Sequence, residues 1–320
     1  MSGTVVITGG CGFLGAALAR LIADKGVGLP DGTRINPQVL LWDRDDAVAP
    51  DIQGVQFQAI DISDPVKVSA AMPDDVVLVY HLAAVVSGQA EADYDLAMEV
   101  NLGGTNAILA ATRAVRDGIP LIGTSSLAVY GGRPAEPLIE ATQIQPQNTY
   151  GVTKAMAELV MADYRRRGWM DARTLRLPTV TVRPGKPNAA ASSFASSIIR
   201  EPLKGDTAIC PVDPAMAMWV ASPAAAVKAL WHAPSVSNND WPAFGAVNVP
   251  GIRVTVAEMI AGLRARAGDE VAALIEMQPD ARIAAIVGTW PTLFDTSLAS
   301  RLGFEGDAGF DAILDQALRM

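Results

Sequence analysis

Short β-branched and apolar runs alternate with longer amphipathic stretches through the first half of the chain. The runs predict strands at residues 4–8, 39–43, 54–61, 76–83, 120–125 and 172–182. Helices are expected at 12–25, from 65, at 92–116 and at 150–167. The strand at 76–83 is apolar on both faces, as a central parallel strand is. This alternation predicts an α/β fold built on a doubly wound parallel sheet.

The second half of the chain has a different pattern. From Pro184 it becomes rich in proline, alanine and serine, with isolated strands expected at 246–249 and 271–277. We therefore expect a main domain of residues 1–183, to which part of 215–249 returns. A smaller substrate-binding lid is expected from 184–214 and 250–320. Residues 26–37 are predicted to be a loop inserted between the first helix and the second strand.

A glycine-rich loop follows the first predicted strand. Residues 9–15 read GGCGFLG and place glycines at Gly9, Gly12 and Gly15, with Phe13 and Leu14 between the last two. Such glycines let the backbone approach a pyrophosphate at a helix N-terminus, and Gly15 allows that helix to pack closely on the sheet. Strand, loop and helix occur in the order the motif requires. The main domain is therefore predicted to be a Rossmann domain that binds a dinucleotide.

Asp43 ends the second predicted strand. A carboxylate there accepts hydrogen bonds from the adenosine ribose and repels a 2′-phosphate, which favours NAD. Two other interpretations stay open: Asp43 caps a turn, or the neighbouring Arg44 accommodates the phosphate of NADP. After the third strand, Asp61 and Ile62 are expected beside the adenine.

Tyr150 and Lys154 carry the main catalytic signal. They are four residues apart at a predicted helix start and share one face. A tyrosine with a pKa of about 10 is a poor base at neutral pH, and a nearby ammonium group favours its phenolate. Ser125 and Ser126, at the end of the fifth strand, are placed to orient a substrate hydroxyl.

Composition excludes several classes of protein. The net charge of −9 argues against a general nucleic-acid binder, and the two cysteines are too few for a disulfide framework. With two histidines and no Cys/His cluster, no metal site is expected. The N-terminus lacks the basic region of a signal peptide, and no apolar run is long enough to cross a membrane. We expect a cytoplasmic enzyme.

Taken together, these motifs resemble the extended short-chain dehydrogenase/reductase family, which includes nucleotide-sugar epimerases. The resemblance rests on TGGCGFLG (8–15), HLAA (81–84), NLGGT (101–105), SSLAVYG (125–131), YGVTK (150–154) and LRLPTVTVRPG (175–185). It implies that Tyr150 is the acid/base, that Lys154 holds the nicotinamide ribose and that Ser126 is the catalytic serine. It further implies supporting or cofactor-lining roles for Asn101, Ala83, Ala84 and Pro178, and a homodimer.

The segment 183–203 resembles the D-erythronate dehydrogenase branch of this family. That resemblance implies oxidation of the C2 hydroxyl of a four-carbon sugar acid to a 2-oxo acid. A sugar acid needs short hydrogen-bonding side chains and a cationic partner for its carboxylate. Arg183 or Arg200 can pair the carboxylate, although a surface role is open for both, and the serines near 192 can instead cap a helix. The candidate donors are Ser87, Ser126, Thr179, Asn188, Ser192 and Ser193.

Three alternatives remain open. A nucleotide-sugar epimerase or dehydratase, or a uronate dehydrogenase, would use the same Ser126, Tyr150 and Lys154. Many extended members carry a V-D-D-x-A signature where this chain has Trp219-Val-Ala-Ser-Pro223, which weakens the epimerase interpretation. A non-catalytic NAD-binding protein is the third. The apolar residues 155–160 after Tyr150 fit either a dimer interface or the core.

Overall fold

A seven-stranded sheet, parallel throughout, forms the main domain of the computed structural model, which describes residues 3–132, 134–185 and 189–319. The strand order reverses beside β1, as in a doubly wound fold, so the predicted fold class is confirmed. Across the sheet the strands are β12 (Ala246–Asn248), β8 (Asp171–Leu177), β7 (Pro120–Ser126), β6 (Val76–His81), β1 (Thr4–Thr8), β4 (Gln38–Asp43) and β5 (Val55–Ala59).

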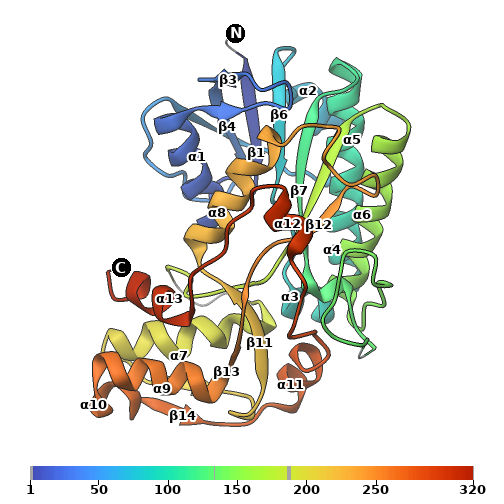
Figure 1. The fold of residues 1–320 in the computed structure, drawn as a ribbon. Coiled ribbons are helices and arrows are strands. Elements are labelled where there is room, and N and C mark those ends of the chain that lie inside the picture. The colour runs from blue at the N-terminus through green and yellow to red at the C-terminus, as the bar shows by residue number, and fades with distance from the viewer. Residues whose placement is uncertain (1–2, 133, 186–188, 320) are drawn as a thin grey trace.

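Helices cover both faces of this sheet (Figure 1). On one face, α1 (Phe13–Lys25) and α8 (Pro223–His232) enclose a core that includes Leu18, Ile22 and Leu230. On the other face lie α2 (Pro65–Ala71), α5 (Gly104–Val115) and α6 (Thr149–Arg166), around Ile108 and Met161. The sheet is therefore buried on both sides, which accounts for the nearly continuous apolar runs of β1 and β6.

The helix expected at 92–116 is divided in the structure. It consists of α4 (Tyr94–Ala97), a π-helical segment η1 (Met98–Gly103) and α5, and it is preceded by α3 (Ser87–Ala92). The Asp93 carboxylate accepts a hydrogen bond from the Leu96 backbone N–H and so begins a new helix at α4.

Three further expectations about single elements are corrected. The strand predicted at 172–182 divides at Pro178 into β8 and β9 (Thr179–Val180), because proline has no N–H to continue the sheet. The strand predicted at 271–277 is a short helix α10 (Asp269–Ala272) followed by β14 (Ile275–Met277). The predicted loop 26–37 contains a small antiparallel pair, β2 (Val27–Gly28) and β3 (Arg34–Ile35).

A second core forms the lid, drawn below the main sheet in Figure 1. Its helices are α7 (Phe194–Leu203), α9 (Val256–Ala267), α11 (Ala281–Val287) and α13 (Phe310–Ala317). β9 leaves the main sheet to pair with β11 (Ala217–Ala221), and β11 pairs with β13 (Ile252–Thr255). β10 (Ala208–Cys210) pairs with β14. The described residues also form three single 3₁₀ turns, η2 (Leu127–Val129), η3 (Ala191–Ser193) and η4 (Ala233–Ser235).

The C-terminal part of the predicted lid does not all belong to it. α12 (Ser297–Arg301) lies against β12, and Ala299 and Phe304 are buried in the core of the main domain. The Phe304 ring packs edge-on against His232 and Trp241. Residues 297–304 therefore pack with the main domain, and so do α8 and β12.

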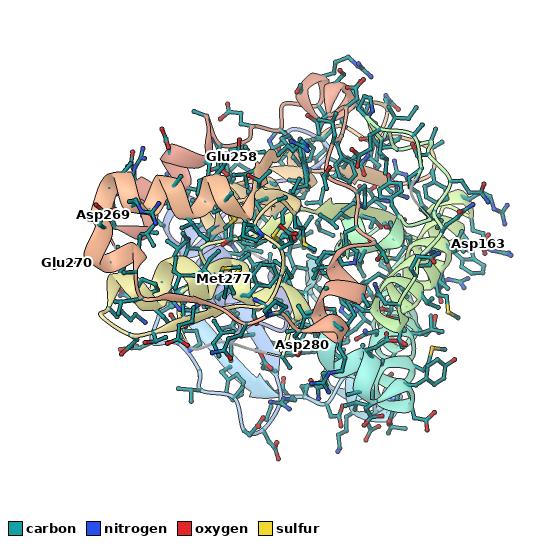
Figure 2. All side chains as sticks on the ribbon, turned by 90° about the horizontal axis from the view of Figure 1, so that it is seen from below. Asp163, Glu258, Asp269, Glu270, Met277 and Asp280 are labelled. Carbon is teal, nitrogen blue, oxygen red and sulfur yellow. The ribbon has the colours of Figure 1, made fainter. Side chains whose placement is uncertain are left out.

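Acidic side chains lie at the outer edges of the molecule when it is viewed from below. Asp269 and Glu270 are at the outer end of the lid, and Asp163 on α6 lies at the opposite edge (Figure 2). None of these three carboxylates lines the cavity described below. Among the described residues, no helix combines the length and apolarity needed to cross a membrane.

Candidate functional site

A cavity of about 630 Å³ lies between the carboxyl ends of the parallel strands and the lid. This is the position at which ligands bind in doubly wound sheets. Most of the side chains singled out in the sequence meet there. The predicted residues that line the cavity are Gly9, Gly12, Phe13, Leu14, Gly15, Asp43, Asp61, Ile62, Ala83, Ala84, Ser87, Ser126, Tyr150, Lys154, Pro178, Thr179, Arg183 and Ser192.

One end of the cavity is formed by the glycine-rich loop. A Cβ atom placed on Gly12 would have only the Gly9 carbonyl oxygen within 4 Å, so the backbone there borders open space. α1 begins directly after Gly12, with no side chain capping its first N–H groups and no acidic residue in its first turn. An open backbone surface at a positive helix end fits the pyrophosphate of a dinucleotide.

Gly15 was expected to let α1 pack on the sheet, and in the structure it lies against the glycine-rich loop itself. A Cβ atom at this position would lie 2.5 Å from the Gly9 carbonyl oxygen, too close for any side chain. The glycine therefore lets the first turn of α1 approach the loop that it follows.

Asp43 closes the same end of the cavity. Its two carboxylate oxygens accept hydrogen bonds from the backbone N–H groups of Cys11 and Arg44, both at 2.9 Å. A carboxylate oxygen has room for a further donor, so Asp43 fits a ribose hydroxyl. The Arg44 guanidinium is directed to Asp46, at 3.1 Å, on the exposed surface. Asp61 also lines the cavity, with one oxygen bound by the N–H and hydroxyl of Ser63.

The catalytic candidates meet where α6 begins beside the end of β7. Asn148 caps α6 by accepting a hydrogen bond from the Gly151 N–H at 2.8 Å. A Cβ atom on Gly151 would lie 2.2 Å from the Ala128 carbonyl oxygen, in the turn that follows Ser126. Only glycine allows this approach, and it brings Tyr150 within hydrogen-bonding reach of the Ser126 hydroxyl. The sequence motif did not predict this role for Gly151.

Tyr150 is held in its protonated form by its surroundings. Burial raises the pKa of Tyr150 to about 12, while the hydrogen bond from Ser126 and the positive charge of Arg183 act in the opposite direction. The sequence led us to expect that Lys154 lowers this pKa, but in the structure the lowering comes from Ser126 and Arg183. The Lys154 ammonium donates instead to the Thr124 carbonyl oxygen at 2.9 Å, and it lies 5.8 Å from the centre of the Tyr150 ring.

Lys154 is a buried cation. Burial lowers the pKa of Lys154 to about 8, and the negative charge of Glu158, one turn later on α6, partly offsets this lowering. Glu158 is itself buried and pairs with Arg176 on β8 at 2.7 Å. The Arg176 guanidinium also donates to the Tyr130 hydroxyl at 2.5 Å. A buried network of Glu158, Arg176 and Tyr130 therefore ties α6 to the sheet one turn beyond Lys154.

Asn101 lies behind the cavity wall and is not among the residues that line it. Its side-chain oxygen accepts from the Val85 N–H at 2.7 Å, and its side-chain nitrogen donates to the Val85 carbonyl and the Thr153 hydroxyl. These bonds join the loop after β6 to α6, so the structure favours a positioning role over cofactor contact.

The lid forms the opposite end of the cavity. Ser87, Thr179, Ser192 and Arg183 line it, whereas Ser193 faces a separate groove between α7 and residues 278–283. The Ser87 hydroxyl accepts a hydrogen bond from the Ala191 N–H at 3.0 Å and so links α3 to the lid. Asn188 lies outside the described residues.

The two candidate arginines differ in what surrounds them. Arg200 is buried and pairs with Glu201, with nitrogen–oxygen distances of 2.7 and 2.5 Å. Arg183 lines the cavity, and no carboxylate of the described residues lies within ion-pair distance of it. Burial and the charge of Arg200 lower the pKa of Arg183, while Tyr150 raises it. Of the two arginines, Arg183 is therefore the one that borders the cavity without a carboxylate partner among the described residues.

Gln89 and Trp290 are among the cavity residues that the sequence did not single out. Gln89 lies on α3, two residues after Ser87, and Trp290 follows α11 in the lid. Trp290 belongs to the second half of the chain, where no local motif marks a substrate-facing position. Its place at the cavity depends on the tertiary packing of the lid.

Known proteins share both the sequence and the fold of this chain. The model of the NAD dependent epimerase/dehydratase family matches residues 5–218. A D-erythronate dehydrogenase from Cupriavidus necator is 48% identical over 315 residues, which cover 97% of this chain and 96% of the relative. A D-erythronate dehydrogenase from Haemophilus influenzae is 39% identical over 317 residues, which cover 98% of each chain.

Solved structures agree on the fold. A nucleoside-diphosphate-sugar epimerase from Agrobacterium tumefaciens superposes with a TM-score of 0.90 at 35% identity, covering 100% of this chain and 94% of the other. An L-threonine 3-dehydrogenase from Trypanosoma brucei superposes with a TM-score of 0.86, covering 98% and 95% of the two chains. At 22% identity, the second likeness shows the fold alone.

Proposed function

The chain belongs to the NAD dependent epimerase/dehydratase family, and on this premise we propose that it is a sugar-acid dehydrogenase that oxidises the C2 hydroxyl of D-erythronate to the 2-oxo acid. It is an oxidoreductase of the extended short-chain type. One observation supports an acidic substrate above all: a cation without a carboxylate partner among the described residues, Arg183, shares a cavity with Ser126 and Tyr150.

Each of the polar side chains in the cavity has a separate role in the proposed reaction. Arg183 binds the substrate carboxylate, which places the C2 hydroxyl, on the adjacent carbon, toward Tyr150. Ser126 orients that hydroxyl, and Tyr150 accepts its proton as C2 loses its hydride. Lys154, held by the Thr124 carbonyl oxygen, would donate to the ribose of the cofactor.

NAD fits the opposite end of the cavity. The open backbone at Gly12 and the N-terminus of α1 would hold its pyrophosphate, and Asp43 would bind its adenosine ribose. When bound, it supplies the hydride acceptor and a positively charged ring. Positive charge near a buried phenol lowers the pKa of that phenol, as Tyr150 requires in order to act as a base.

The first prediction is that the protein reduces NAD when it is given D-erythronate. Increasing NADH absorbance is the measurement, with D-threonate, L-threonate and a uronate in parallel and with NADP in a separate series. The Tyr150→Phe variant should lose roughly 100- to 10,000-fold in rate, because it keeps the ring and removes the base. The Tyr164→Phe variant, changed on the same helix but away from the cavity, should keep its activity.

Failure with every acid, in protein that binds NAD, would contradict the proposal. Equal or better activity with NADP would contradict the role of Asp43.

A nucleotide-sugar epimerase is the second candidate, favoured by the likeness to the nucleoside-diphosphate-sugar epimerase from Agrobacterium tumefaciens. Such an enzyme would use the same Ser126, Tyr150 and Lys154, but it would return the hydride to its substrate. Conversion of a UDP- or dTDP-sugar without net NADH would identify this activity.

A further inference from the structure

We propose that Ser196 and Arg200 of α7 are positioning residues that hold Arg183 in place for a substrate carboxylate, and so make the site selective for acids. This inference rests on the proposed function, since it concerns the same site. It assigns to the lid a role in choosing the charge of the substrate.

Two side chains of α7 form hydrogen bonds with the backbone of Arg183, one at its N–H and one at its carbonyl oxygen. The Ser196 hydroxyl oxygen accepts a hydrogen bond from the Arg183 N–H at 3.0 Å. One guanidinium nitrogen of Arg200 donates to the Arg183 carbonyl oxygen at 2.7 Å. Ser196 and Arg200 are four residues apart, so they share one face of the helix. Both are buried, at 1% and 5% exposure, where such hydrogen bonds are shielded from water.

The same helix also holds the chain just before Arg183. The Thr181 hydroxyl donates to the Ala195 carbonyl oxygen at 2.9 Å and lies 3.2 Å from the Ser196 hydroxyl. Pro184, directly after Arg183, has no N–H with which to anchor the segment. The backbone position of Arg183 therefore depends on contacts from α7.

Arg200 itself is not available to the substrate. Two of its nitrogens bind the Glu201 carboxylate, and a third donates to Arg183. Glu201 therefore neutralises the charge of Arg200 inside the lid. Arg183 has no carboxylate partner among the described residues and faces the cavity. Arg183 therefore binds the substrate carboxylate, and Arg200 holds Arg183 in position.

The geometry matters because an arginine–carboxylate pair is directional. A guanidinium group binds a carboxylate through two parallel hydrogen bonds, and a displacement of about 1 Å is enough to disturb the alignment of a bound substrate. Loss of the hydrogen bonds from α7 to Arg183 should therefore weaken binding of the acid and leave binding of the cofactor unchanged.

The test compares D-erythronate with its neutral amide, D-erythronamide. Binding of each to NADH-loaded protein is measured by isothermal titration calorimetry, which does not depend on turnover. The wild-type protein should prefer the acid. In Arg183→Gln this preference should fall roughly 100-fold, and in Ser196→Ala and Arg200→Gln roughly 10-fold, with the affinity for NADH unchanged.

Matched variants separate positioning from general damage. Arg264→Gln removes an arginine from α9 in the same lid and should keep the full preference. Arg200→Lys keeps a cationic donor and should recover part of the preference. If Arg200→Gln does not fold because Glu201 is left unpaired, the Arg200→Gln/Glu201→Gln double variant removes both charges together.

The outcomes are distinct. An unchanged preference in Ser196→Ala and Arg200→Gln, or in Arg183→Gln, would overturn the inference. A wild-type protein that prefers the acid but does not oxidise it would refute the proposed function and leave the positioning role standing. A wild-type protein without preference for the acid would refute the positioning role.

Discussion

At the scale of single residues, Lys154 links the stability of the protein to pH. The ordinary pKa of a lysine is 10.5, and burial lowers that of Lys154 to about 8 in the folded protein. Between these two pH values the unfolded chain holds a proton that the folded protein has released. The free energy of unfolding therefore rises with pH across this window, and below it the buried charge destabilises the fold.

We predict that Lys154→Met removes this dependence. The stability of the wild-type protein relative to the variant should increase by up to about 3 kcal/mol between about pH 7.5 and pH 10.5. Urea unfolding at several pH values measures the difference, and repeating it in a Tyr150→Phe background removes any contribution from the neighbouring phenol. A difference that stays constant with pH would show that Lys154 is not destabilised by burial.

At the scale of elements, the start of α6 determines whether Tyr150 meets Ser126. The helix approaches η2 so closely that the Ala128 carbonyl oxygen would lie 2.2 Å from a side chain at Gly151. Backbone atoms cannot yield as a flexible side chain can, so the helix itself must move if this position changes.

We predict that Gly151→Ala destabilises the protein by roughly 1–3 kcal/mol and lowers its activity by more than that loss explains. Thermal unfolding and steady-state rates, taken well below the melting temperature, measure the two effects. The matched control is Gly103→Ala, since Gly103 has helical angles and its nearest atom would be 3.8 Å away. It should be neutral or stabilising by up to about 1 kcal/mol. Equal behaviour of the two variants would contradict this account.

The sequence predicted elements well where one periodic pattern ran without interruption. The strands of the main sheet and helices α1, α2 and α6 lie close to the predicted ranges. Predictions failed where a single residue ended an element locally, as Pro178 does after β8 and Asp93 does before α4. The residues expected to bind the cofactor lie in contiguous motifs, so a local pattern was enough to single them out. The place of Trp290 at the cavity depends on contacts between distant segments, and so do the hydrogen bonds from α7 to Arg183. No local sequence pattern encodes such contacts.

At the scale of the whole molecule, the main domain and the lid share the C-terminal segment. Phe304, 4% exposed, is buried in the core of the main domain, while Ile313, 1% exposed, is buried in that of the lid. Only a few residues separate them, so loss of either core removes an anchor from the other. The homodimer stays a prediction, with Leu159 on α6, 53% exposed, as an apolar side chain available to a partner.

We predict that the two parts unfold together. Phe304→Ala should cost about 3–5 kcal/mol and Ile313→Ala about 2–5 kcal/mol, and each should shift one common unfolding transition. Coincident curves from tryptophan fluorescence and far-ultraviolet circular dichroism test this. Val48→Ala, at an 88% exposed position, should change stability by less than about 0.5 kcal/mol. Two separate transitions, each moved by only one variant, would refute shared unfolding.

The chain leaves the lid before α12 and re-enters it at α13, so the lid is not formed by one continuous segment of the sequence. Exchanging it for the lid of another oxidoreductase would require several junctions, each cut through a packed interface. Engineering a new substrate preference is therefore better begun with substitutions in place, on α7 and around Arg183, than with recombination of whole segments. In this fold, preference for a different alcohol substrate is reached by changing side chains while the path of the backbone stays the same.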